Sequence, residues 1–286
     1  MNVGILTCAR LPELLESDQK LIPLFKQYNI NAKAVIWDDD SIDWTTFDYL
    51  LFRNIWDYYQ KENTFNDWLK KMESLGIKTL NPLAVIQQNK HKFYLKELEK
   101  KGVLILPTIF LEKNSKKSLE NILPRNWEKI VIKPAFSAGS YLTKLVDRSE
   151  IESIQKEFEE HFETKDFLLQ EFRPEIKELG ETSFIFFNGN FSHAINKKPV
   201  EGDFRVQIQY GGNYTLVEPS IKLITQAKAI LNQIPEQLLY ARIDGIVKDN
   251  QLHLMEIELI EPDLYFDIAI GSRERFVEAF LEIVKT

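Results

Sequence analysis

The sequence is poor in the residues that stabilise secreted proteins, form zinc sites or cross membranes. One cysteine, Cys8, excludes an intramolecular disulfide, and four dispersed histidines exclude a local zinc motif. No apolar run approaches the roughly 18 residues of a membrane span. Residues 1–9 are apolar but lack a basic leader, so we expect them to form a strand and not a signal peptide. These absences predict a cytoplasmic protein without a membrane partner.

The sequence also lacks an excess of positive charge. Its formal net charge of −7 argues against general nucleic-acid binding, although a locally basic pocket for one nucleotide is compatible with it. An apolar fraction of 44% and a charged fraction of 28% are typical of globular proteins. A chain of 286 residues can form two or three subdomains, and a homo-oligomer is compatible with this composition.

The first eighty residues alternate between apolar strands and helical stretches. Such alternation predicts a parallel sheet flanked by helices, which ends near Pro82. The expected strands are 2–7, 33–37 and 48–53, the expected helices are 14–28 and 65–75, and residues 77–82 close the unit. A further helix is expected over 90–101, because Gly102 suits a helix C-cap.

Strand patterns dominate the rest of the chain. The dipeptide Asn188-Gly189 predicts a tight hairpin between two strands. The expected strands are 129–134, 142–146, 167–172, 182–187, 190–196 and a pair within 240–259, and the expected helices are 149–162, 219–233 and 273–284. The patterns predict an α/β part followed by an α+β part.

Residues 252–262, LHLMEIELIEP, carry two glutamates two positions apart. Because side chains alternate along a strand, Glu256 and Glu258 are expected on one face, beside Leu252 and Leu254. Neighbouring carboxylates repel each other unless a cation lies between them, and Mg²⁺ is commonly held by one or two carboxylates together with substrate phosphates. The pattern predicts a nucleotide site, although a solvent-facing acidic strand edge would look the same.

The turn of this hairpin decides whether a third acid, Asp244, joins the pair. A two-residue turn over 249–250 would place Asp244 opposite Met255 and away from the glutamates. A three-residue connection that includes Gln251 would place Asp244 opposite Glu256. We predict the second register, since only it gathers three acidic groups.

Residues 135–140, AFSAGS, follow Lys133 at the end of an apolar strand. Small residues let backbone N–H groups approach phosphate oxygens, and the lysine supplies a positive charge. The segment predicts phosphate binding without a Walker motif, in a loop that includes Ser137, Gly139 and Ser140. A lysine that ends a strand before a surface turn would show the same pattern.

The order of these and further motifs resembles that of the ATP-grasp superfamily. The motifs in chain order are NKHKFYL, KIVIKP with AFSAGS, FLLQEF, IKELGE, the pair Lys197-Lys198, GDFRVQ, and the acids near the end. The resemblance covers roughly 81–268 and is closest to the glutathione-synthetase-like branch, which includes the D-cycloserine-forming ligases. It implies an ATP-grasp fold with an amino-terminal Rossmann-like domain over 1–82, a small central lobe over 83–172 and a carboxyl-terminal lobe over 173–286.

The resemblance also implies which residues bind the nucleotide, between the last two of these domains. Lys92 and Lys133 match the lysines that contact the α- and β-phosphates. The match to the adenine-binding hinge falls on Gln170, Glu171 and Phe172, and Glu181 matches the acid that binds ribose.

Phosphoryl transfer is the second role that the resemblance implies. Lys197 matches a cation near the γ-phosphate, with Lys198 as the alternative, and Arg205 matches the arginine that faces the transferred phosphoryl group. The match to the ligands of two Mg²⁺ ions, for which Mn²⁺ is an alternative, falls on Asp244, Glu256 and Glu258. Glu258 departs from the family, which usually has asparagine there.

Substrate recognition is expected in the amino-terminal domain, because ligands gather at the carboxyl ends of parallel strands. Thr7 ends the first strand, and Arg53 ends the third, followed by Trp56 and Asp57. A terminal arginine suits bidentate carboxylate recognition. The cluster resembles one in cycloserine-type relatives, although packing or helix capping would explain the same residues.

The resemblance implies an ATP-dependent ligase that joins a small carboxylate to an amine through an acyl phosphate, with an amino acid or a peptide as substrate. Ring closure of one amino-acid derivative is an alternative. A nucleotide-binding regulator without turnover and a small-molecule kinase on the same fold are two others. A glycine-rich loop over 200–213 is expected to close over the reactive intermediate.

Overall fold

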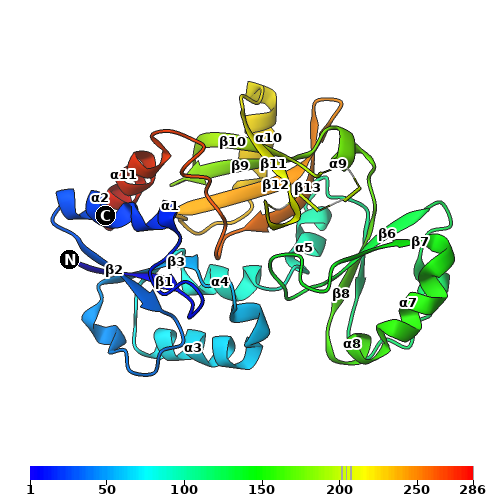
Figure 1. Ribbon diagram of the computed structural model, residues 1–286, viewed down its shortest axis with the longest axis horizontal. Coiled ribbons are helices and arrows are strands. Elements are labelled where there is room, and N and C mark those ends of the chain that lie inside the picture. The colour runs from blue at the N-terminus through cyan, green and yellow to red at the C-terminus, as the bar shows by residue number, and fades with distance from the viewer. Residues whose placement is uncertain (201, 204, 207, 286) are drawn as a thin grey trace.

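Three β-sheets joined by helices make up the protein (Figure 1). The computed structural model describes residues 1–200, 202–203, 205–206 and 208–285. Within these ranges, no helix has both the length and the apolar character needed to cross a bilayer. The amino-terminal sheet and the sheet of β6–β8 lie at opposite ends of the view in Figure 1, with the longest sheet between and above them.

The amino-terminal sheet is parallel and has the strand order β2-β1-β3-β4, as the alternating pattern predicts. Its strands are β1 (Asn2–Thr7), β2 (Asn31–Ile36), β3 (Tyr49–Asn54) and β4 (Thr79–Leu80), and its helices are α1 (Glu16–Gln19), α2 (Leu21–Gln27) and α3 (Glu62–Ser74). The single helix expected over 14–28 is divided at Lys20. Pro23 has no N–H to bond the carbonyl four residues earlier, so an unbroken helix would lose a hydrogen bond there.

The central sheet is antiparallel and has the strand order β5-β8-β6-β7. Its strands are β5 (Thr108–Leu111), β6 (Lys129–Pro134), β7 (Lys144–Asp147) and β8 (Phe167–Glu171), and α6 (Leu119–Ile122), α7 (Ile151–Glu157) and α8 (Glu159–Thr164) accompany it. Trp127, Ile130 and Phe167 belong to a core that this sheet shares with α7 and α8. Strand β5 was not predicted, because four residues carry too little alternation to be recognised.

The third sheet has the order β11-β10-β9-β12-β13. It consists of β9 (Glu181–Phe187), β10 (Asn190–Lys198), β11 (Asn213–Val217), β12 (Tyr240–Lys248) and β13 (Gln251–Glu258), with α9 (Glu175–Glu178), α10 (Ile221–Leu231) and α11 (Ser272–Val284). The hairpin at Asn188-Gly189 is confirmed: both residues have positive φ, and Phe187 pairs with Asn190. Strand β11 lies at the edge and was not predicted.

Two short helices connect the first two sheets, α4 (Leu83–Asn89) and α5 (Tyr94–Lys100), where one helix over 90–101 was expected. The break between them places Lys92 in a turn, from which its N–H donates to the carbonyl oxygen of Ala135 at 2.8 Å. Val85 and Leu95 share a hydrophobic core with Phe184 and Ile243 of the third sheet. The domain boundaries after residues 82 and 172 stay predictions.

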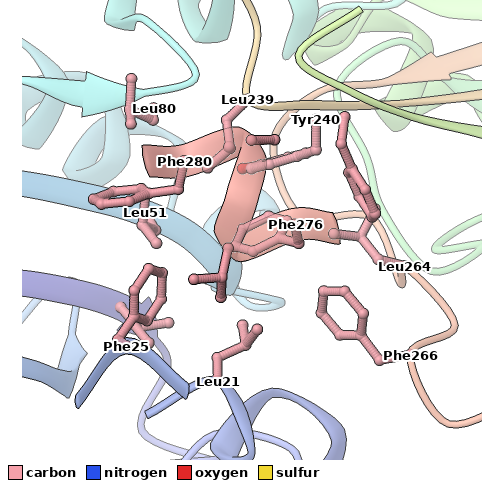
Figure 2. Packing of buried hydrophobic residues seen from close by; sticks show 14 of the residues in the cluster. Leu21, Phe25, Leu51, Leu80, Leu239, Tyr240, Leu264, Phe266, Phe276 and Phe280 are labelled. Atoms are coloured by element: carbon pink, nitrogen blue, oxygen red, sulfur yellow. The ribbon is translucent and has the colours of Figure 1, made fainter. Parts of the chain in front are cut away.

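Helix α11 joins the two ends of the chain in one hydrophobic core. Figure 2 shows Phe276 and Phe280 of α11 among Phe25 of α2 and Leu51 of β3. The rings of Phe25 and Phe280 meet edge to face, with centroids 5.0 Å apart. Burial of large aromatic side chains is among the strongest contributions to packing, so the amino-terminal sheet is held firmly against the carboxyl-terminal helix.

Asn81 fastens the amino-terminal sheet to the third sheet by hydrogen bonds. Its side chain is fully buried. The amide nitrogen donates to the carbonyl oxygens of Tyr240 (2.8 Å) and Leu259 (2.9 Å), and the amide oxygen accepts from the N–H of Leu239 at 2.8 Å. The bonded backbone groups lie at or next to the ends of β12 and β13. Asn81 therefore holds these two strands in place.

Replacement of Asn81 by alanine should lower the free energy of unfolding by roughly 3 kcal/mol or more, because it leaves several buried backbone groups unpaired. Urea denaturation measures the change. Asn190→Ala, at an exposed position at the start of β10, is the matched control and should unfold like the wild type. Equal midpoints for the Asn81 variant and the wild type would contradict the role of this side chain.

Candidate active site

A cleft of about 820 Å³ lies where the three sheets meet. Trp56 and Tyr58 line it from the amino-terminal domain, Lys133 and Gln170 from the central sheet, and Asp244 from the third sheet. Most of the predicted nucleotide and metal residues line this cleft: Lys92, Lys133, Ser137, Gly139, Ser140, Gln170, Glu171, Phe172, Glu181, Lys197, Arg205, Asp244, Glu256 and Glu258. Their individual roles stay predictions.

The hairpin of β12 and β13 brings Asp244 opposite Glu256, as predicted, but by a different geometry. The turn contains only residues 249–250, so the predicted three-residue connection is wrong. A bulge after Asp244 supplies the extra residue instead, since Gly245 pairs with Leu254 and leaves Met255 without a partner across the strand. The three acids therefore line the same cleft because of an irregularity inside the hairpin.

Gly245 makes this bulge possible. A Cβ at this position would lie 2.4 Å from a carbonyl oxygen of β13, so no other residue fits without a shift of the backbone. Because the bulge reverses the alternation, Leu252 and Leu254 lie in the core, whereas Glu256 and Glu258 line the cleft. The expectation that the glutamates lie on the same face as these leucines is therefore wrong.

Basic side chains of the cleft pair with its acids. The Nε of Arg242 donates to Asp244 at 3.0 Å, its Nη2 donates to Asp244 at 2.8 Å, and Nη2 also bonds Glu258. The ammonium group of Lys92 lies 3.1 Å from Glu256 and donates to the carbonyl oxygen of Ser137 at 2.5 Å. Lys92 thus links the predicted phosphate-binding loop, residues 135–140, to Glu256 of β13.

Lys197 and Glu181 form a further buried pair, and Lys197 also lies 3.7 Å from Asp244. Burial lowers the pKa of Lys197, but attraction to Asp244 and Glu181 outweighs it, so the pKa is raised well above its usual value. Lys198, the alternative in the prediction, is exposed and does not line the cleft. The geometry therefore favours Lys197.

Burial and repulsion between neighbouring carboxylates act on the acids of the cleft. Burial raises the pKa of Glu258 to about 8, and although Arg242 lowers it, neighbouring acids add to the rise. For Asp244, burial is outweighed by Arg242 and Lys197, so the pKa of this carboxyl is lowered. A bound cation would relieve the remaining repulsion.

Carboxylate oxygens are the donors that Mg²⁺ prefers, so the chemistry of Asp244, Glu256 and Glu258 fits the ion. In the described part of the chain, however, no three acidic, histidine or cysteine side chains lie close enough together to hold a metal ion. Arg242 separates two of the acids, and Lys92 engages the third. Both basic side chains must exchange partners before the acids can share an ion.

The opposite end of the cleft is apolar. Leu106, Ile176, Val206 and Ile246 form a small cluster against Phe172. These residues and Met255, which the bulge leaves unpaired, line the cleft beside the predicted adenine hinge, and none but Phe172 was recognised in the sequence. A flat apolar pocket with a few polar groups at its edge suits a purine base.

Arg205 also lines the cleft, on the loop over 200–213. Its guanidinium pairs with Asp203 at 2.8 Å and lies 3.7 Å from the centre of the Tyr210 ring. Residues 201, 204 and 207 of the loop lie outside the described residues. Closure of the loop stays a prediction.

Of the four predicted substrate residues, only Trp56 lines the cleft. Thr7, Arg53 and Asp57 are buried. The Nε of Arg53 donates to Asp18 at 2.8 Å, and its charge lies over the ring of Tyr240. Among the residues that the structure describes, none bonds its Nη1. These three residues therefore lie in the interior and do not line the cleft.

Several lining residues escaped the sequence analysis. Arg242 lies two positions before Asp244 on one strand and so shares its face, a periodicity that would have revealed it. Glu261 and Asp263 follow β13 in an irregular segment. Tyr58, which belongs to the predicted substrate cluster, also lines the cleft from the 3-10 helix η2 (Tyr58–Gln60). Segments without a regular period give no comparable indication.

Comparison with known proteins places this geometry in a family. The sequence profile described as "Prokaryotic glutathione synthetase, ATP-grasp domain" matches residues 91–269, which is more than half of the chain. The chain belongs to this ATP-grasp family. It is thus an ATP-grasp ligase, and the predicted fold and enzyme class are confirmed. ATP-grasp enzymes use ATP with Mg²⁺, in agreement with the predicted cofactors.

A second profile, "D-cycloserine synthetase DcsG, N-terminal domain", matches residues 3–81 of this ATP-grasp chain. The cycloserine biosynthesis protein DcsG of Streptomyces lavendulae is 24% identical over 302 aligned positions, which cover 99% of this chain and 100% of that protein. The crystal structure of D-cycloserine synthetase DcsG has a TM-score of 0.86 at 21% identity, with 99% of both chains covered. D-alanine–D-alanine ligase from Bacillus anthracis, complexed with ATP, has a TM-score of 0.72 at 16% identity, with 99% of this chain and 96% of that chain covered.

Substitution of Lys133 by glutamine should weaken binding of a nonhydrolysable ATP analogue about tenfold or more, since a hydrogen bond to a charged group contributes about 1.5–3 kcal/mol. Titration calorimetry measures the affinity. Lys129→Gln, on the same strand but exposed and paired with Asp147, is the matched control. An unchanged affinity in the Lys133 variant would contradict a phosphate-binding role.

Binding of Mg²⁺ with ADP at neutral pH should release protons. The pKa of Glu258 is raised to about 8, so the carboxyl is largely protonated below that pH and must ionise to hold a metal. Affinity should therefore rise with pH through this pKa. Calorimetric enthalpies in buffers of different ionisation heat measure the released protons, and Glu258→Gln should reduce the release. Enthalpies that do not depend on the buffer would contradict it.

Proposed function

We propose that this ATP-grasp ligase activates a small carboxylate as an acyl phosphate and transfers it to a nitrogen nucleophile. One observation carries the proposal: the acids of β12 and β13 line a single cleft together with Lys92 and Lys133, the lysines predicted to bind phosphate. The same cleft extends to Trp56 and Tyr58 of the amino-terminal domain. Reactants bound at its two ends would meet beside Glu256 and Glu258.

The reaction requires two transfers. First, a substrate carboxylate attacks the γ-phosphorus of ATP, and ADP departs. The nitrogen then attacks the carbonyl carbon of the acyl phosphate, and inorganic phosphate leaves. Lys92 and Lys133 hold the phosphates of ATP, while Lys197 and Arg205 face the transferred group. When bound, Mg²⁺ supplies positive charge against the β- and γ-phosphates, with two ions as our expectation and Mn²⁺ as an alternative.

Ring closure within one amino-acid derivative is a second candidate. It is favoured by the match of residues 3–81 to the amino-terminal domain of D-cycloserine synthetase and by the full-length similarity to the Streptomyces lavendulae protein. In this case the carboxylate and the nitrogen belong to one molecule. The cleft would then need to bind one small substrate beside the nucleotide.

Phosphate release should be screened with D- and L-amino acids, their derivatives and dipeptides. A substrate carboxylate labelled with heavy oxygen should transfer one labelled atom to phosphate, because the carboxylate oxygen becomes the bridging oxygen of an acyl phosphate. Asp244→Asn should reduce turnover by about 10²-fold or more, as loss of charge stabilisation does in other enzymes. Unlabelled phosphate, or a stable phosphorylated product, would exclude the proposed pathway.

The same screen separates the two candidates. Formation of ADP with a single amino-acid derivative, without an added amine, supports ring closure. A requirement for two compounds supports the intermolecular ligase. Product mass decides between them independently, because the cyclic product is one water lighter than its substrate.

A further inference from the structure

Glu261 lies between the two halves of the cleft. It follows β13 by three residues, just after the acids predicted to hold metal, and lines the cleft together with Trp56 and Tyr58. Its backbone carbonyl oxygen accepts a hydrogen bond from the Nε1 of Trp56 at 3.0 Å. The hydroxyl of Tyr58 lies within reach of its carboxylate, and this contact raises the pKa of Tyr58 and lowers that of Glu261. Both contacts hold Glu261 against the amino-terminal domain.

The acids predicted to bind nucleotide or metal differ from Glu261 because they form ion pairs. Asp244 and Glu258 pair with Arg242, Glu256 pairs with Lys92, and Glu181 pairs with Lys197. Within the described ranges, no ion pair is found for Glu261, and its neighbour Tyr58 is neutral. Lys92 and Arg242 attract the carboxylate only from farther away.

A nitrogen nucleophile needs such a group. An amine is protonated at neutral pH, and an ammonium group has no lone pair with which to attack a carbonyl carbon. The acyl phosphate forms beside the predicted metal acids, and the amino-terminal domain closes the other end of the cleft. A group that accepts a proton from the nucleophile must lie between these two places, where Glu261 lies.

We propose that Glu261 binds the ammonium group of the nucleophile and accepts its proton, and that Tyr58 positions the carboxylate for this step. The inference rests on the proposed function. One proton moves from R–NH₃⁺ to the Glu261 carboxylate, and the freed lone pair forms the new C–N bond. The bond between the carbonyl carbon and the phosphate oxygen breaks. A second proton leaves the nitrogen with the departing phosphate, which becomes hydrogen phosphate.

The electrostatic surroundings agree with this role. Burial raises the pKa of Glu261 to about 7, with Lys92 lowering it and Glu256 raising it. A base works best when its pKa lies near the working pH. The charged and titratable groups that influence Glu261 come from four elements: Tyr58 of η2, Lys92 before α5, Arg242 of β12, and Glu256 and Glu258 of β13.

Hydroxylamine separates proton acceptance from every earlier step, because it is largely unprotonated at neutral pH and attacks acyl phosphates without a base. We measure hydroxamate formation with the best acyl donor of the amino-acid panel, and amide formation with the best amine. In Glu261→Gln, the ratio of amide to hydroxamate formation should fall about 10²-fold or more. Tyr58→Phe should lower the same ratio by a smaller factor, since it keeps the ring but removes the donor.

Glu278→Gln is the matched control, because Glu278 is an exposed glutamate on α11, and it should leave the ratio at the wild-type value. If Glu261→Gln reduces amide and hydroxamate equally, or reduces neither, the proposal for Glu261 is overturned while the ligase reaction stands. If the wild type forms no hydroxamate with any donor, the acyl-phosphate pathway fails, and the role of Glu261 fails with it.

Discussion

Charge balance within the cleft constrains the arrangement of the whole site. Arg242 lies between Asp244 and Glu258, and Lys92 links Glu256 to the carbonyl oxygen of Ser137. Without these contacts, several carboxylates would be crowded in a partly dry space, at a large cost in free energy. Triphosphate and metal bring both signs of charge, so we expect their binding to exchange one set of ion-pair partners for another. Because Lys92 contacts both Glu256 and Ser137, a change of partner at Glu256 would also affect the predicted phosphate-binding loop, residues 135–140.

The regular parts of the fold could be predicted from the sequence because their patterns are long. Residues 129–134 form β6 as expected, and the Asn188-Gly189 turn joins β9 and β10. The order of the lysines and acids was sufficient to predict the family. Short strands such as β5 and β11 escaped prediction, since hydrogen bonds to neighbouring strands, and not their own composition, hold them in place.

The details of the site depend on contacts between distant segments, which no local pattern contains. The bulge at Met255 lies between two pairing registers. The turn sets the register of residues 245–248 with 251–254, whereas residues 242–244 pair with 256–258 in a register shifted by one. Arg53 was expected to meet substrate, but Asp18, far from it in sequence, draws its guanidinium into the interior. The proposed role of Glu261 depends on its contact with Tyr58, which lies about two hundred residues away in the sequence.

The core around Phe276 and Phe280 has a consequence for engineering. Because α11 completes the hydrophobic interior of the amino-terminal sheet, the first and last segments of the chain form one structural unit. A chimera that exchanges residues 1–82 alone would pack foreign side chains against the original α11. This helix would then lose the packing partners of its own chain. An exchange of the amino-terminal sheet therefore calls for two crossover points, so that α11 is exchanged together with it.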